Sequence, residues 1–137
     1  MTRDEDALFH LNFARQSESK DDFLGARMGY LKCVESLKQA GNYIESENVT
    51  KEYDAFVQRD PIFKKLISVL FPFIQSNPGI LQSEIVKKAE SLDWSMLYGY
   101  NRPVAKEDIY YALYFSDKFG KITRIKKGRS YELRIKS

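Results

Sequence analysis

Basic side chains gather near the end of this chain, in a pattern that suits phosphate binding. Residues 120–137 contain seven Lys or Arg and a single Glu. In the last part of this stretch Tyr131, Leu133 and Ile135 alternate with charged residues, which is typical of a half-buried strand. Lys127-Gly128 supplies a tight turn before that strand, because glycine adopts positive φ at little cost. We therefore expect a basic two-stranded hairpin that attracts phosphate groups.

The residue types that could catalyse a reaction or bind a metal do not occur at the spacings that either task needs. His10 is the single histidine, and no cysteine or carboxylate stands at ligand spacing from it. Cys33 is the single cysteine and is expected to be a buried, inert thiol. The pair Asp21-Asp22 is explained as a helix cap. No glycine-rich phosphate loop or nucleophile motif occurs, so we expect no enzyme, no cofactor and no bound metal.

A helix over residues 106–118 precedes the hairpin, and Gly120 ends it. Its inward side is expected to carry Ile109, Ala112, Leu113 and Phe119. The outward face is expected to carry these side chains: Lys106, Asp108, Tyr110, Tyr111, Tyr114 and Lys118.

Three further elements are predicted upstream of that helix. The apolar spacing of Phe63, Leu66, Ile67, Leu70 and Ile74 predicts a helix over 62–76, which Pro72 should kink or restart. Asn77-Pro78-Gly79 breaks the chain, and Ile80-Leu81-Gln82 can form a short strand. Ser83 is then expected to cap a short helix over 84–89.

The order helix, short strand, short helix, helix, hairpin resembles a winged helix-turn-helix domain over residues 62–136. Residues 77–85 look like the start of its second helix, and 119–124 look like its junction between helix and wing. The resemblance implies double-stranded DNA as a partner, with the third helix in the major groove and the wing on phosphates. The implied DNA-binding residues are Lys106, Tyr110, Tyr111, Tyr114, Arg124, Lys126, Lys127, Arg129 and Arg134. Tyrosines and acids are a poor set for reading base edges, so weakly specific binding is expected.

Residues 91–104 form an insertion beside the third helix of the resemblance, where three or four residues are usual. Trp94 and Leu97 are expected to cover the core. The tip of the insertion is expected to contact DNA or a protein partner through Tyr98, Tyr100, Asn101 and Arg102.

Three helices are predicted in the first half. The first follows Asp4-Glu5-Asp6 and runs through Leu8, Leu11 and Ala14, with Phe9 and Phe13 flanking that stripe. The second carries Phe23, Ala26, Tyr30, Val34 and Leu37 and ends at Gly41-Asn42. The third carries Val49, Tyr53, Phe56 and Val57 and stops before Asp60-Pro61.

The first two of these helices weakly resemble a tetratricopeptide repeat or a microtubule-interacting and trafficking module. Ala14, Ala26 and Cys33 fall at its small positions and Tyr30 at a large one, although His10 departs from its first aromatic position. A single repeat cannot bury its own apolar face, so the third helix or a second subunit must cover it.

The distribution of charge and the length of the chain indicate how the domains are organised. Residues 1–60 contain 12 acidic and eight basic side chains, whereas residues 61–137 contain seven acidic and 14 basic ones. A chain of 137 residues can hold two small domains, here 1–59 and 62–137. Because each domain is small, the chain is expected to form a homodimer.

The fold class expected is mainly α, a three-helix module followed by a winged helix with a small β-hairpin. No apolar run is long enough for a membrane span, and one cysteine suits a reducing cytoplasm.

We therefore expect a small cytoplasmic transcriptional regulator or accessory factor that binds DNA, in which the N-terminal helices supply dimerisation or contact with a protein partner. The alternative is a protein-interaction adaptor in which the winged helix and the helical module bind protein and no nucleic acid.

Overall fold

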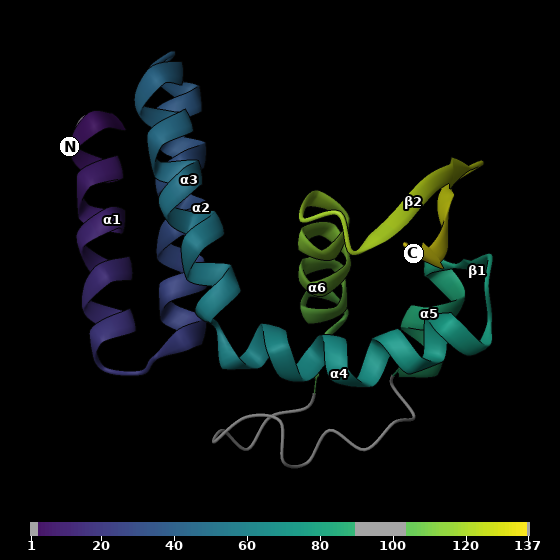
Figure 1. Cartoon of the computed structure of the whole chain (residues 1–137). Helices are drawn as coiled ribbons and strands as arrows, with labels where there is room; N and C mark the ends of the chain where they lie inside the picture. Colours follow the sequence, from purple (N-terminus) through teal and green to yellow (C-terminus); the bar gives the residue numbers. More distant parts are fainter. Residues whose placement is uncertain (1–2, 90–103, 137) are drawn as a thin grey trace. The chain divides into compact units, whose positions relative to one another are not determined.

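The computed structural model describes residues 3–89 and 104–136, which form six helices and a three-stranded antiparallel sheet (Figure 1). The expected class, mainly α with a small β element near the end, is confirmed. The helices are α1 Arg3–Ser19, α2 Phe23–Gln39, α3 Tyr43–Arg59, α4 Pro61–Ser76, α5 Gln82–Ala89 and α6 Lys106–Lys118. The strands are β1 Ile80–Leu81, β2 Ile122–Lys127 and β3 Ser130–Ile135.

The chain divides into two compact units, Met1–Pro61 (unit 1) and Ile62–Ser137 (unit 2). In unit 1, both α1 and α3 pack against α2. The turns between its helices are set by short polar side chains. Asp22 accepts a hydrogen bond from the Gly25 N–H at 3.0 Å, as expected for a cap, and Asn42 accepts one from the Glu45 N–H at 3.3 Å.

Small residues let α1 and α2 approach closely. A Cβ atom added to Gly29 would lie 2.7 Å from the Cβ of Ala14 and 2.8 Å from the carbonyl oxygen of His10, so only glycine fits there. Ala14, Ala26 and Cys33 are all buried, as expected of small positions in a close-packed hairpin. The buried Tyr30 lies beside them, with its ring next to those of Tyr53 and Phe56 from α3.

The apolar stripe expected on α1 is wrong at Leu8, which is 59% exposed. The residues of α1 that are buried against the rest of the unit are Ala7, Ala14 and Ser17. Because α1 packs through these small residues, its large apolar side chains flank the contact instead of filling it. Leu8, Phe9 and Phe13 therefore all remain exposed.

A group of charged side chains closes one end of unit 1 around the hydroxyl of Tyr30. This hydroxyl lies 3.1 Å from Glu18 Oε1 of α1 and 3.2 Å from Glu52 Oε2 of α3. Arg15 makes a bidentate pair with Glu52 at 2.8 Å, and Arg59 pairs with Glu18 at 2.7 Å. These five residues, here called the Tyr30 cluster, tie α1 to α3 across α2.

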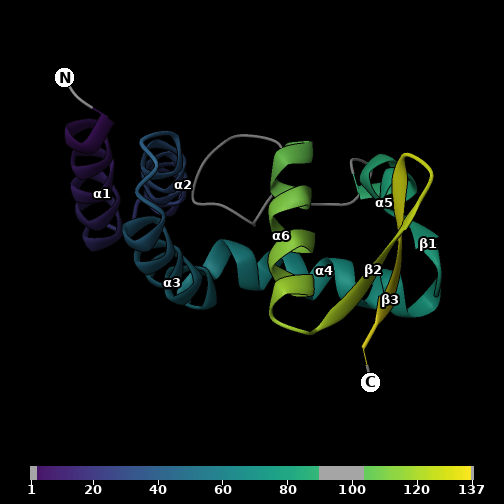
Figure 2. The ribbon, with the colours of Figure 1, turned by 90° about the horizontal axis from the view of Figure 1, so that it is seen from above.

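In unit 2, α6 lies across α4 and leads into the hairpin (Figures 1 and 2). The predicted side of α4 is buried at Phe63, Leu66, Leu70 and Ile74. The helix is one segment from Pro61 to Ser76, so of the two effects expected of Pro72, a kink or a restart, the restart does not occur. Phe63 contacts the rings of Tyr111 and Phe119 edge-on, and this contact joins α4 to α6.

The sheet has the order β1-β3-β2, and β3 lies in its centre (Figure 2). Ile80 pairs with Leu133, and Ile122 pairs with Ile135, so their apolar side chains share the buried face. The expected cap at Ser83 is wrong, because α5 begins at Gln82, two residues earlier than expected, and Ser83 lies inside the helix. The Ser83 N–H instead donates to Ser130 Oγ at 3.1 Å, so β3 satisfies the start of α5.

Candidate nucleic-acid interface

Both ends of α6 are fixed by local hydrogen bonds. At its start the Asp108 carboxylate accepts the Ala105 N–H at 2.8 Å. At its end Gly120 adopts a φ of +74°, and the Lys121 N–H donates to the Ser116 carbonyl at 2.8 Å. This is a glycine-terminated helix end of the kind that the sequence predicted. The glycine at this helix end sets the direction in which the chain enters β2.

The outward face of α6 is smaller than predicted. Lys106, Tyr110, Tyr114 and Lys118 are exposed, as expected. Tyr111 is only 7% exposed, and its ring contacts those of Phe63 and Phe115, so its assignment to an outward DNA-binding face is wrong. Asp108 is buried because it caps the helix, so it does not belong to the outward face either.

The hairpin turn presents its basic residues to solvent. Lys127 pairs with Ser130, so the two residues between the strands are Gly128 and Arg129. Gly128 has a φ of +60°, as a two-residue hairpin loop with glycine at its first position requires. Lys126, Lys127 and Arg129 are all exposed and are here called the tip cations.

Arg124 is the residue that joins the hairpin to α6. Its guanidinium pairs with Asp117 of α6 at 3.2 Å and lies 3.4 Å from Gln82 Oε1 of α5. The same group lies over the ring of Tyr131, 4.7 Å from its centroid, and 5.7 Å from that of Tyr114. Only 14% of the side chain is exposed. Arg124 is thus occupied within unit 2, although the resemblance implied that it binds DNA.

Arg124 also places α6 and the hairpin tip on one face. Side chains two residues apart on a strand share a side, so Lys126 lies beyond Arg124 on the same side of β2. Lys126 is directly opposite Tyr131, on which Arg124 stacks. The face therefore runs from Tyr114 of α6 through Arg124 and Tyr131 to Lys126.

The other side of the hairpin carries a shared carboxylate. Glu132 accepts hydrogen bonds from Arg134, the shorter at 2.9 Å, and lies 3.7 Å from the Lys127 ammonium. The hydrogen bonds from Arg134 hold the pKa of Glu132 below its usual value. Lys127 and Arg134 are thus partly neutralised, whereas Lys126 and Arg129 make no ion pair within the described part of unit 2.

Sequence reasoning did not identify the partners of Arg124, namely Asp117, Gln82 and Tyr131. Asp117 stands one position before Lys118 on a helix whose outward face was assigned by periodicity alone. No spacing along the chain links it to Arg124, because the pairing depends on the angle between α6 and β2.

Four of the predicted contact residues, Tyr98, Tyr100, Asn101 and Arg102, lie outside the described residues, as do Trp94 and Leu97. Within residues 3–89 and 104–136, no three or more His, Cys, Asp or Glu side chains gather as a metal site would require. In the same part of the chain, no helix is both long and apolar enough to cross a membrane.

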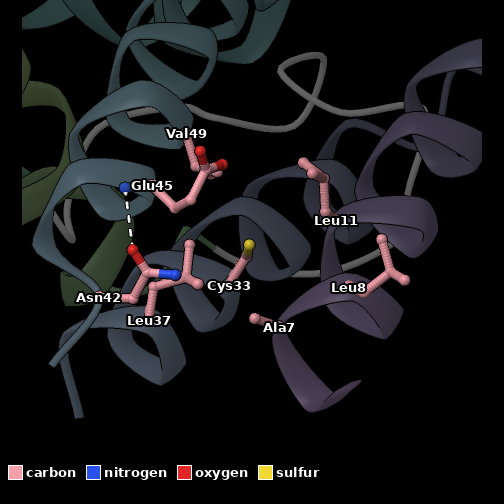
Figure 3. A pocket seen from close by; sticks show the side chains of 8 residues that line it. All are labelled: Ala7, Leu8, Leu11, Cys33, Leu37, Asn42, Glu45 and Val49. Atoms are coloured by element: carbon pink, nitrogen blue, oxygen red, sulfur yellow. Dashed lines mark hydrogen bonds between the residues drawn. The ribbon is translucent and has the colours of Figure 1, made fainter. Parts of the chain in front are cut away.

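Unit 1 has a groove of about 220 Å³ between the first half of α1, the last part of α2 and the first part of α3 (Figure 3). Cys33 and Leu37 of α2 form its floor, Leu8 and Leu11 belong to α1, and Glu45 belongs to α3. Burial raises the pKa of the Cys33 thiol to about 11, so the thiol stays protonated near neutral pH. The predicted burial of Cys33 is confirmed, and the groove contains no activated nucleophile.

Comparisons with protein-family models, with curated proteins and with solved structures found no match to this chain.

Proposed function

We propose that unit 2 is a winged-helix domain that binds double-stranded DNA, and that the chain is a small transcriptional regulator or accessory factor. One observation carries the proposal. The unpaired cation Lys126 and the exposed face of α6 lie on a single surface, and Arg124 holds them together. Such a surface presents positive charge to a phosphate backbone while a helix lies beside it.

The tip cations supply the affinity in this proposal. Lys126 and Arg129 have no carboxylate to satisfy them within the described residues, so phosphate groups are their natural partners. Tyr110 and Tyr114 can donate their hydroxyls to phosphates but make weak base-specific contacts. Binding should therefore depend strongly on salt and weakly on sequence.

The test is the binding of the full chain to a random-sequence duplex, followed by fluorescence anisotropy over a series of salt concentrations. The logarithm of the binding constant should fall linearly with the logarithm of salt, by about 0.9 per phosphate neutralised. The double variant Lys126→Glu and Arg129→Glu, which reverses the two cations without a carboxylate partner in the described part of the chain, should abolish binding at every salt concentration.

The matched control is Lys64→Glu with Lys65→Glu, which changes the net charge equally at exposed positions of α4. This variant should retain most of the affinity. Failure of the unmodified chain to bind any duplex at low salt would rule out the proposal. Equal losses in the two double variants would mean that overall charge, and not the tip, attracts DNA.

A second candidate function is a protein-interaction adaptor that binds no nucleic acid. Ile125 favours it, because this residue is 54% exposed on the side of β2 opposite to Arg124 and Lys126. An Ile125→Ser variant should bind DNA normally under the first proposal. It should lose a captured protein partner under the second.

A further inference from the structure

The outer side of α1 carries an acid at one end and a base at the other. Its charge order is therefore complementary to the same order taken in reverse. Residues at steps of three and four lie within about 60° of one another on a helical wheel and share one side of a helix. The outward side of α1 and the turn after it carries Glu5, Phe9, Asn12, Phe13, Gln16 and Lys20 in this order, all of them exposed. An acid stands at one end, two aromatic rings lie near the middle, and a base stands at the other end. This set is here called the α1 outer stripe.

The stripe borders a shallow hollow between α1 and α2. The hollow has a volume of about 160 Å³, and Phe9 and Phe13 of α1 and Met28 of α2 line it. It exists because the two backbones approach closely at Ala14 and Gly29, which leaves the larger side chains to form walls on the outside. Walls and hollow together offer ridges and a groove to a packing helix.

From these observations we propose that the α1 outer stripe pairs with the same stripe of a second copy of this chain, antiparallel and about a two-fold axis between residues 12 and 13. In that arrangement Glu5 faces Lys20 of the second copy and Lys20 faces its Glu5. Phe9 and Phe13 of each copy lie over the central part of the other. A parallel pairing would instead place like charges together, so the charge order selects the antiparallel one.

The exposed area supports a dimer of modest strength. Phe9 is 58%, Phe13 45% and Met28 51% exposed. With large side chains of roughly 200 Å² each, they leave about 300 Å² of apolar surface in water per copy. Pairing two copies covers about 600 Å², close to the apolar share of the smallest stable interfaces. Glu5, Asn12, Gln16 and Lys20 supply the polar remainder.

The proposal does not rest on DNA binding, and its test uses the full chain without DNA. Sedimentation equilibrium should give twice the chain mass of 16.0 kDa. The variants Glu5→Lys and Lys20→Glu each place like charges across the axis twice, so each should raise the dimer dissociation constant about tenfold. An equimolar mixture of the two variants should restore the affinity, because the mixed pair is complementary at both ends.

The mixture separates pairing from folding. A variant that is merely destabilised remains destabilised when mixed, so recovery can come only from contact between copies. The control pair is Glu47→Lys with Lys51→Glu on α3, two exposed positions away from the stripe. These variants should leave the dissociation constant unchanged, alone and mixed.

Crosslinking tests the axis itself. In a Cys33→Ala background, Asn12→Cys should form an intermolecular disulfide under mild oxidation, since the axis lies beside it. Ser19→Cys, also exposed on α1, should not. A monomer at every concentration would overturn the proposal, as would a mixture that fails to recover. Crosslinking at position 19 as well as at position 12 would indicate a parallel pair, which brings every position of the stripe to its own copy, and would overturn it too.

Discussion

Charged side chains are used in opposite ways in the two units. In unit 1 the Tyr30 cluster places two arginines against two carboxylates around one buried hydroxyl. In unit 2 the tip cations are three positive charges exposed to solvent, and although Lys127 lies 3.7 Å from Glu132, Lys126 and Arg129 make no ion pair within the described residues. Balanced charges can hold helices together, whereas like charges repel and contribute nothing to the folded state. The Tyr30 cluster is therefore explained by the fold, whereas the tip cations fit the phosphate ligand that we propose for them.

The largest effect expected from this comparison is on Tyr30. Tyr30→Ala removes a buried ring that contacts Tyr53 and Phe56, and should destabilise unit 1 by about 3–5 kcal/mol. Tyr30→Phe keeps the ring and removes only the hydroxyl, so it should cost about 1 kcal/mol. Hydrogen exchange followed by mass spectrometry measures this for α1–α3 peptides separately from those of unit 2.

The matched variant in unit 2 is Arg129→Ala, which should change the stability of either unit by less than about 0.5 kcal/mol. If Tyr30→Phe costs as much as Tyr30→Ala, then the charged cluster and not ring packing dominates. A stability loss in Arg129→Ala would remove the contrast between the two sets of charges.

Two arginines of the hairpin allow the same comparison within unit 2, because Arg124 is ion-paired with Asp117 and Arg129 makes no ion pair within the described residues. Arg124→Gln removes the pair with Asp117 and the stacking on Tyr131, and should destabilise the hairpin by about 1–2 kcal/mol. Arg129→Gln should leave stability unchanged and weaken DNA binding. Thermal unfolding and anisotropy titrations measure the two effects.

The salt dependence of DNA binding then distinguishes a residue that positions the hairpin from a residue that contacts phosphate. Arg129→Gln should lower the slope of log affinity against log salt by about 0.9, the value for one lost phosphate contact. Arg124→Gln should lower the affinity and keep the slope, since its guanidinium is occupied by Asp117. A reduced slope in Arg124→Gln would show that Arg124 contacts phosphate after all.

The sequence predicted those features that depend on neighbours along the chain. Ile109 and Leu113 are buried at helical spacing, and Gly120 and Gly128 adopt the positive φ values that their positions need. Prediction from the sequence failed where the surroundings of a residue are supplied by another helix or strand. Tyr111 was placed outward because periodicity does not show how much of a helix its neighbours cover. Arg124 was assigned to DNA binding because its carboxylate partner belongs to α6, where spacing along the chain does not reveal it.

Acid should weaken unit 1 through Glu52. The hydrogen bonds from Arg15 hold the pKa of Glu52 below its usual value of 4.5. A carboxyl whose pKa is lower in the folded chain stabilises it fully above the usual value and loses this effect as the pH falls through the folded one. Protection of α1–α3 amides should therefore decline as the pH falls below the usual carboxyl pKa of 4.5.

Glu52→Gln should be less stable near neutral pH and should show a smaller further decline in acid. Glu47→Gln, which removes an exposed carboxyl from the same helix, should behave like the unmodified chain. A decline of equal size in Glu52→Gln would place the acid-sensitive group elsewhere.

The smallest effect expected is a gain of DNA affinity from Glu132→Gln. The hydrogen bonds from Arg134 lower the pKa of Glu132, so this carboxylate stays ionised and competes with phosphate for Lys127 and Arg134. Its neutral replacement should release both cations and tighten DNA binding about two- to fivefold at low salt. The control Glu35→Gln makes the same change of net charge at an exposed position of unit 1, and should have less effect. If the two variants gain equally, the gain reflects net charge alone, and the distinction between neutralised and available cations at the hairpin fails.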